Sequence, residues 1–104
     1  MDTETPGTAA VSADSARDLA ELFRALADPG RIRIVGALAD GRKNVGELAA
    51  AADLSESAVS HHLRGLRLMR LVRTEKEGRH VYYTMDDEHV FEIFRCGLDH
   101  VHHR

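Results

Sequence analysis

Apolar residues recur at intervals of three and four through most of the chain, which is the spacing of one face of an α-helix. The first such stretch predicts an amphipathic helix from about Asp14. Its apolar positions are Leu19, Leu22, Phe23 and Leu26. The preceding residues 1–13 are small and polar without periodicity, so we expect a disordered tail there.

A second helix is predicted to begin where Asp28 precedes Pro29. An aspartate can cap free amides at a helix start, and the fixed φ of proline suits the first turn. The apolar face of this helix consists of Ile32, Val35 and Leu38. Asp40 and Gly41 predict its end.

Two further helices follow closely. Asn44 and Glu47 have the spacing of a capping box and open a short helix that ends at Ala52. Ser55 is a good N-cap for the next helix, which is predicted to end near Leu68. The residues that this longer helix would bury are Val59, Leu63 and Leu66.

The pattern changes after residue 70. Two β-rich runs, Leu71–Thr74 and Val81–Thr84, are separated by a charged stretch that ends in Gly78 and Arg79, which predicts a hairpin. A last helix is expected from Asp86 or Asp87 nearly to the end of the chain. The predicted fold is therefore mainly α with one β-hairpin, in the order helix, helix, helix, helix, hairpin, helix.

Length and composition limit the classes of protein to consider. The 104 residues suffice for one domain but bury only about 60–65% of the surface of the unfolded chain, so stability alone is marginal and dimerisation is a reasonable expectation. The single cysteine excludes an intramolecular disulfide framework and a cysteine-rich zinc module. No apolar run approaches the ~18 residues that span a bilayer, and no signal peptide is evident, so we expect a cytoplasmic protein without a membrane partner.

The net charge of −3 by itself argues against nucleic-acid binding, but the charges are distributed unevenly along the chain. Residues 1–28 carry six acids against two arginines, whereas residues 61–80 carry six bases against two glutamates. A phosphate backbone responds to the local field, so the basic middle of the chain remains a candidate DNA-binding region. Its bases are Arg64, Arg67, Arg70, Arg73, Lys76 and Arg79.

The helices Asn44–Ala52 and Ser55–Leu68 form a helix-turn-helix candidate. Small hydroxyl side chains at the start of the second helix would let it approach the major groove closely and contact phosphates or base edges. The candidate DNA-binding residues are Ser55, Ser57, Ser60, His61 and Arg64, with Lys76 and Arg79 at the hairpin tip. The alternative is a surface helix with solvated charges and a stabilising hairpin.

Three segments resemble the ArsR/SmtB family of winged-helix metal-sensing repressors: FRALADPGRIRI at 23–34, LSESAVSHHL at 54–63 and GRHVYY at 78–83. The resemblance runs in order through about residues 15–103 and implies a winged helix-turn-helix domain over residues 14–104. It further implies a homodimer, paired through its first and last helices, that binds operator DNA without metal and is weakened in that binding by metal. The residues Ser57, Ser60 and His61 match the family's DNA contacts by position.

Metal-ligating residue types gather on the last helix. At ~100° per residue, His89, Cys96, His100 and His103 form one narrow stripe, and His102 lies on the other side. Asp87 could converge with His89 at the helix start. The two ends of the stripe are ~16 Å apart, too far to share one ion at ~2 Å bond lengths.

Each chain would therefore supply two half-sites. If two last helices pack antiparallel about a two-fold axis, Asp87 and His89 of one chain meet His100 and His103 of the other. The same four residues resemble the C-terminal-helix site of the zinc- and cobalt- or nickel-sensing family members. One carboxylate and three imidazoles favour zinc, with cobalt or nickel as the other transition metals to consider.

Other interpretations remain open from the sequence. Asp87 alone could be an N-cap beside ordinary surface histidines. The family's soft-metal sensors often carry cysteines in the first helix of the helix-turn-helix or near the N-terminus, and this chain has none there. Cys96 is expected to be a packing residue, but a regulator that responds to redox state through it, or to no signal at all, is the main alternative. A small zinc hydrolase and a pure protein-interaction domain are two further classes, of which the first lacks an open metal position.

Overall fold

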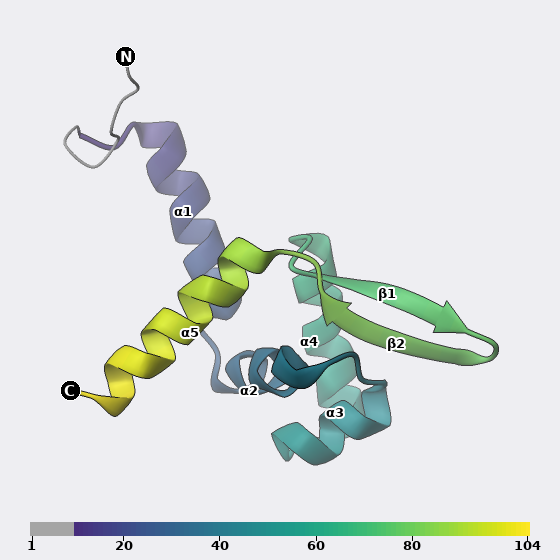
Figure 1. Ribbon diagram of the computed structural model, residues 1–104. Helices are drawn as coiled ribbons and strands as arrows, with labels where there is room; N and C mark the ends of the chain where they lie inside the picture. Colours follow the sequence, from purple (N-terminus) through teal and green to yellow (C-terminus); the bar gives the residue numbers. More distant parts are fainter. Residues whose placement is uncertain (1–9) are drawn as a thin grey trace.

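A computed structural model describes residues 10–104 of the chain, so most of the predicted tail of residues 1–13 lies outside the described residues. Five α-helices and one antiparallel hairpin follow in the predicted order (Figure 1). The helices are α1 (Ala13–Leu26), α2 (Pro29–Ala37), α3 (Val45–Ala52), α4 (Glu56–Leu68) and α5 (Glu88–His102), with strands β1 (Val72–Glu77) and β2 (His80–Met85) between α4 and α5. The helical body is thus interrupted once by a hairpin wing, which consists of β1, β2 and their turn.

A side-chain cap fixes the start of every described α-helix. The caps are Ser12, Asp28, Asn44, Ser55 and Asp87, and each side chain accepts a hydrogen bond from the backbone N–H three residues on. The predicted capping box of Asn44 and Glu47 is complete, with both reciprocal hydrogen bonds present at 2.8 and 2.9 Å. These polar residues confirm four predicted helix starts to within one residue, and α1 begins one residue earlier than predicted.

The end of α2 differs from the prediction. The α-helix stops at Ala37, and a 3₁₀ turn over Leu38–Asp40 continues it to Gly41. Gly41 has φ +132°, a conformation that favours glycine and ends the turn. The stop signal in the sequence therefore marks the end of the whole helical segment, whose last turn has tightened.

The wing is longer than the two β-rich runs. Each strand has six residues, and the register from Val72 opposite Met85 to Glu77 opposite His80 leaves only Gly78 and Arg79 in the turn. Gly78 has φ +63°, and a glycine at the first central position suits a type II′ turn. The charged stretch between the runs therefore extends the strands and does not form a loop.

The core lies among α2, α3, α4 and the base of the wing. Its largest fully buried side chains are Ile34, Val35, Leu48, Val59, Leu63 and Leu66. The prediction for α4 is confirmed, whereas Ile34 was missing from the predicted face of α2. Leu71 and Val72 are buried at the base of the wing, and Val90 is buried near the start of α5.

Two helices leave apolar surface uncovered in the single chain. α1 projects away from the helical body (Figure 1) and buries only Ala25 and Leu26. Its Phe23 is 49% exposed, and Val101 of α5 is 50% exposed. An open apolar groove of about 440 Å³ is lined by Phe23, Leu26, Ile32, Ile93, Phe94, Gly97, Leu98 and Val101. Within residues 10–104, no helix is long and apolar enough to cross a membrane.

Candidate nucleic-acid interface and metal ligands

A sharp turn joins α3 to α4. Asp53 adopts the left-handed conformation at φ 56° and ψ 51°, and Leu54 donates its N–H to the carbonyl of Ala49 at 3.0 Å. The Ser55 hydroxyl then accepts from Ala58 N–H at 3.0 Å and starts α4. Since the turn is so short, the orientation of α4 follows directly from that of α3.

The exposed side of α4 carries the candidate DNA-binding residues. Val59, Leu63 and Leu66 face the core, and the opposite side exposes Ser57, Ser60, His61 and Arg64. These four side chains occupy the stripe that the sequence predicted for contact with DNA. Their arrangement suits a helix lying in a major groove with its N-terminal half toward the bases.

Polar contacts hold the inner side of α4 against α2. Arg31 Nε donates to His62 Nδ1 at 3.3 Å, and His62 Nε2 lies 3.5 Å from the Asp28 carboxylate that caps α2. Arg31 Nη1 also donates to the carbonyl of Ala25 near the end of α1, at 3.1 Å. One arginine therefore connects α1, α2 and α4. No local sequence pattern predicts this connection.

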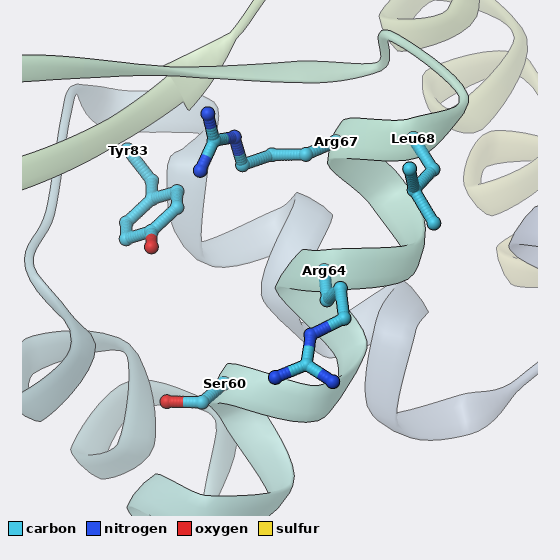
Figure 2. Close-up of a pocket in the computed structure, with 5 residues that line it drawn as sticks. All are labelled: Ser60, Arg64, Arg67, Leu68 and Tyr83. Carbon is cyan, nitrogen blue, oxygen red and sulfur yellow. The ribbon is translucent and has the colours of Figure 1, made fainter.

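An open groove of about 400 Å³ separates α4 from the wing and is lined by Ser60, Arg64, Arg67, Leu68 and Tyr83. In Figure 2, the guanidinium of Arg67 extends from α4 toward Tyr83 on β2. Neither Arg67 nor Tyr83 was among the predicted site residues. Arg67 follows Arg64 by three residues and could have been found from helical spacing, but the position of Tyr83 depends on how the wing packs.

Lys76 and Arg79 lie in the outer part of the wing. Lys76 pairs with Val81, one position before the last strand pair, and Arg79 is in the turn. Both are exposed. Because side chains alternate along a strand and opposite residues share a face, Lys76 lies on the same face of the wing as Tyr83. This face borders the groove beside α4.

The first two predicted metal ligands lie together at the start of α5. Asp87 Oδ1 accepts the N–H of Val90 at 3.1 Å, and the same oxygen is 3.8 Å from Nδ1 of His89. The His89 side chain is fully exposed. Asp87 therefore caps the helix and also lies beside His89, so the capping role and the ligand role are compatible.

The other two predicted ligands, His100 and His103, lie exposed in the last turn of α5 and at its C-cap. His103 Nδ1 is 2.7 Å from the carbonyl oxygen of Asp99. Within the described part of the chain, no three His, Cys, Asp or Glu side chains gather closely enough to hold a metal ion. A four-ligand site built from these residues therefore needs both ends of α5, contributed by different chains. Cys96, which lies in α5 between the two ends, is a free and exposed thiol.

Comparison with known proteins identifies the family. The model for "Bacterial regulatory protein, arsR family" matches residues 28–74. The Synechocystis "Transcriptional repressor SmtB homolog" is 50% identical over 91 residues, which cover 88% of this chain and 69% of that protein. The chain belongs to the ArsR/SmtB family. Its members, including the Mycobacterium tuberculosis regulator NmtR, 35% identical over 92% of this chain and 80% of its own, are transcriptional regulators and not enzymes.

Solved ArsR/SmtB-like structures share the whole architecture. The AntR antimony-specific transcriptional repressor superposes with a TM-score of 0.84 at 28% identity, over 99% of this chain and 96% of its own. A homodimeric winged helix-turn-helix domain from Mycobacterium bovis superposes with a TM-score of 0.74 at 29% identity, over 92% and 95% of the two chains. The winged helix-turn-helix fold and the predicted helix order are thereby confirmed.

Proposed function

We propose that this ArsR/SmtB regulator represses transcription as a homodimer and leaves its operator when zinc binds between the two C-terminal helices. The observation that carries the proposal is the placement of two ligand pairs, Asp87 with His89 and His100 with His103, at opposite ends of the exposed helix α5. Neither pair is sufficient alone for tetrahedral coordination. Two antiparallel copies of α5 would complete two identical sites.

The uncovered apolar surface supports the dimer. The α1–α5 groove exposes Phe23, Leu98 and Val101, and a second copy with the same groove would bury these side chains. The homodimeric state of the similar Mycobacterium bovis domain is consistent with this pairing. Pairing through α1 and α5 leaves α4 and the wing of each chain free for DNA.

The donor set of the proposed sites suits zinc. One carboxylate and three imidazoles match the ligands that zinc takes in tetrahedral geometry, and cobalt or nickel are the alternatives. Asp87 keeps one oxygen free while the other caps α5, and the contact of His103 Nδ1 with the Asp99 carbonyl leaves Nε2 for the metal. When bound, the ion would cross-link the two helices.

Operator recognition is assigned to the outer side of α4 and to the wing. The residues in this role are Ser55, Ser57, Ser60, His61, Arg64, Lys76 and Arg79. The Ser55 hydroxyl accepts a bond within the helix cap, so its own O–H remains available to donate to a phosphate. Two α4 helices in a dimer would address successive half-sites on double-stranded DNA.

Release requires a modest coupling free energy. Metal must weaken DNA binding by the same factor by which DNA weakens metal binding. A tenfold effect corresponds to ~1.4 kcal/mol and a thousandfold effect to ~4 kcal/mol. Fixing the relative orientation of two rigid helices is a sufficient source for energies of this size.

The test is fluorescence anisotropy on a labelled duplex from the region upstream of the protein's own coding sequence, titrated with zinc. Zinc is expected to release the wild type but not the His100→Ala/His103→Ala variant, whose DNA affinity without zinc should be unchanged. The matched control is His102→Ala, because His102 is in the same turn but outside the ligand stripe. Equal release of all three proteins would refute the C-terminal site.

The exposed thiol of Cys96 favours one alternative, a regulator that responds to oxidation. In that case zinc would leave DNA binding unchanged, and a mild oxidant such as diamide would weaken it. The Cys96→Ser variant would then be insensitive to diamide. The same anisotropy assay therefore separates the two functions.

A further inference from the structure

The wing is attached to the rest of the chain mainly at its base. Leu71 and Val72 are buried, whereas the side chains from Lys76 to Val81 are all exposed. An isolated two-stranded hairpin is at best marginally stable in water. The outer part of the wing therefore depends on contacts beyond its buried base.

Arg42, in the segment before α3, reaches the wing at three points. Its Nη1 lies 3.3 Å from Oε1 of Glu75, and its Nη2 lies 2.6 Å from Oε1 of Glu77. Its Cζ is 4.2 Å from the centre of the Tyr82 ring, a cation–π distance. The hydrogen bond to Glu77 raises the pKa of Arg42 above its already high usual value, so its charge is constant. A single guanidinium thus contacts both strands beyond the buried base.

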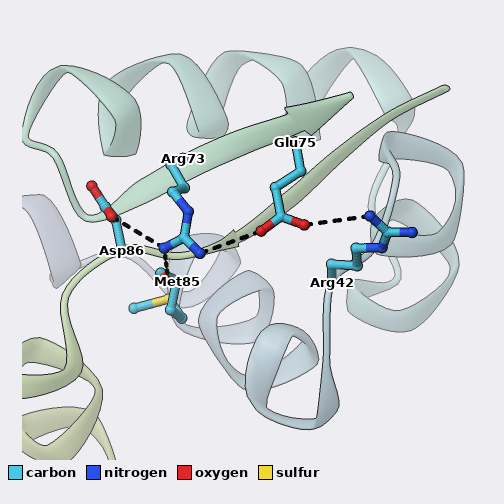
Figure 3. Close-up of polar contacts among 5 residues, drawn as sticks. All are labelled: Arg42, Arg73, Glu75, Met85 and Asp86. Carbon is cyan, nitrogen blue, oxygen red and sulfur yellow. Dashed lines mark hydrogen bonds and ion pairs between the residues drawn. The ribbon is translucent and has the colours of Figure 1, made fainter. Parts of the chain in front are cut away.

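Arg42 with Glu75, Glu77 and Tyr82 forms a brace on the wing. Neighbouring contacts extend this brace along β1. Glu75 Oε2 also lies 3.3 Å from Arg73 Nη2, and Arg73 Nη1 is 3.2 Å from Asp86 Oδ1, so a continuous row runs from Asp86 to Arg42 (Figure 3). The residue after Arg42 adds backbone pairing. Lys43 and Tyr83 exchange two hydrogen bonds of 3.0 and 2.8 Å. Residues 42 and 43 therefore hold the wing through side chain and main chain together.

The contacts of Arg42 and the candidate DNA-binding residue Lys76 lie on opposite faces of the wing. The register places Glu75, Glu77 and Tyr82 on one face, and alternation puts Lys76 and Tyr83 on the other. Tyr83 lines the groove beside α4. Arg42 consequently contacts the face directed away from that groove, and its guanidinium is occupied by two carboxylates.

We infer that Arg42 is a positioning residue for operator binding. It fixes the angle of the wing through Glu75, Glu77 and Tyr82, and thereby presents Lys76 and Arg79 to DNA without contacting DNA itself. The inference deepens the proposed function and depends on its DNA-binding half only. Because exposed ion pairs contribute little to global stability, losing the brace should loosen the wing and leave the fold intact.

Removing the acidic partners separates positioning from simple electrostatics. The Glu75→Gln/Glu77→Gln variant loses two negative charges from the wing, and charge alone predicts tighter DNA binding. Positioning predicts the reverse, because glutamine amides hold the guanidinium only weakly. The two explanations therefore differ in sign.

The experiment compares the full-length wild type with Arg42→Gln, Arg42→Lys and the double glutamine variant. Amide hydrogen exchange of residues 74–83 reports the wing, and anisotropy on the upstream duplex at several salt concentrations reports DNA affinity. Arg79→Gln is the control for a direct phosphate contact. Arg17→Gln is the control for loss of a remote charge, since Arg17 is exposed on α1.

Faster exchange in the wing and about three- to tenfold weaker DNA binding are expected for Arg42→Gln and for the double variant. Arg42→Lys should recover part of both, since lysine keeps the charge but not the planar fork. The salt slope should stay unchanged for Arg42→Gln and fall by about one for Arg79→Gln.

Unchanged wing exchange in Arg42→Gln, or tighter DNA binding by the double variant, would overturn the inference. A fall in the salt slope of Arg42→Gln equal to that of Arg79→Gln would also overturn it, because Arg42 would then contact a phosphate. If the wild type failed to bind the duplex, the proposed function would fail, and hydrogen exchange would still decide whether Arg42 fixes the wing.

Discussion

Gly65, in the middle of α4, lies directly against the guanidinium of Arg31 in α2. A Cβ at residue 65 would come within 2.8 Å of Arg31 Nη2 and 3.2 Å of its Cζ. The same guanidinium donates to the Ala25 carbonyl and to His62. The absence of a side chain at residue 65 therefore allows one arginine to join three helices.

Replacing this glycine should reveal the competition between helix propensity and the Arg31 contacts. Alanine in place of glycine inside a helix gains about 1 kcal/mol. In Gly65→Ala, displacement of the Arg31 guanidinium should cancel much of that gain, because its hydrogen bonds are strained or lost. In an Arg31→Ala background, the same change should recover the full stabilisation. Urea denaturation of the four proteins measures this coupling, and additive effects would show that Arg31 accommodates the methyl group freely.

The adjacent histidines of α4 should have separate roles. His61 is exposed on the candidate DNA-binding stripe of α4, whereas the His62 side chain is only 18% exposed and is hydrogen-bonded to Arg31 of α2. His61→Ala should weaken DNA binding without changing the unfolding temperature. His62→Ala should lower the free energy of unfolding by about 1–2 kcal/mol. Thermal unfolding and anisotropy on the same samples test both, and a reversed pattern would reassign the two faces of α4.

Arg67 should contact the DNA backbone. Its side chain lines the groove beside Tyr83, and its guanidinium has no hydrogen-bond or ion-pair partner among residues 10–104, so its charge is available to a phosphate. Arg67→Ala should weaken binding to operator and unrelated duplexes alike and reduce the salt slope by about one. Loss of affinity for the operator duplex alone would instead indicate a base contact.

Substitution at Asp87 can separate helix capping from metal binding. Asparagine caps a helix about as well as aspartate, but its amide is a much poorer zinc ligand than a carboxylate. Asp87→Asn should keep the stability of the wild type and lose more than about tenfold in zinc affinity. Asp87→Ala should lose the affinity and about 1 kcal/mol of stability as well. Competition with a chelator and thermal unfolding measure the two quantities, and undiminished zinc affinity in both variants would exclude Asp87 as a ligand.

The Asp40–Lys43 pair makes the free energy of unfolding depend on pH, and the sign of this dependence follows from the pKa shift of Asp40. A hydrogen bond and the charge of Lys43 lower the pKa of Asp40 below its usual value of 3.8. The pair therefore stabilises the fold at neutral pH, and this small contribution is lost as the pH falls below 3.8 through the lowered pKa. In Lys43→Met, the pKa of Asp40 should rise toward its usual value. Carboxyl NMR titration measures it, and an unmoved pKa would mean that Lys43 is not the cause.

The fold was predictable where local chemistry decides it. Asp28, Asn44 and Ser55 start helices because each side chain caps amides a few residues away, and such short-range bonds are readable from sequence. The exposed stripe of α4 follows from helical spacing in the same way. Arg67 was counted among the bases of this region but not among the contact residues, although the same spacing predicts it.

The remaining site residues depend on contacts between distant parts of the chain. Tyr83 joins the groove because the wing folds back beside α4, and Arg42 contacts Glu75 and Glu77, more than 30 residues away. No local pattern encodes such pairs. The same reason explains why the brace and the Arg31 connection emerged only from the structure.

If the proposed dimer forms through the uncovered face of α1, repression depends on the concentration of the protein. In the proposed dimer, Leu19 and Phe23 find their partners only in another molecule, so at low concentration the paired species grows with the square of the number of chains. Halving the synthesis of a dilute protein would then reduce the DNA-competent form about fourfold. Gene dosage, as well as metal, would then determine how strongly the regulated promoter is repressed.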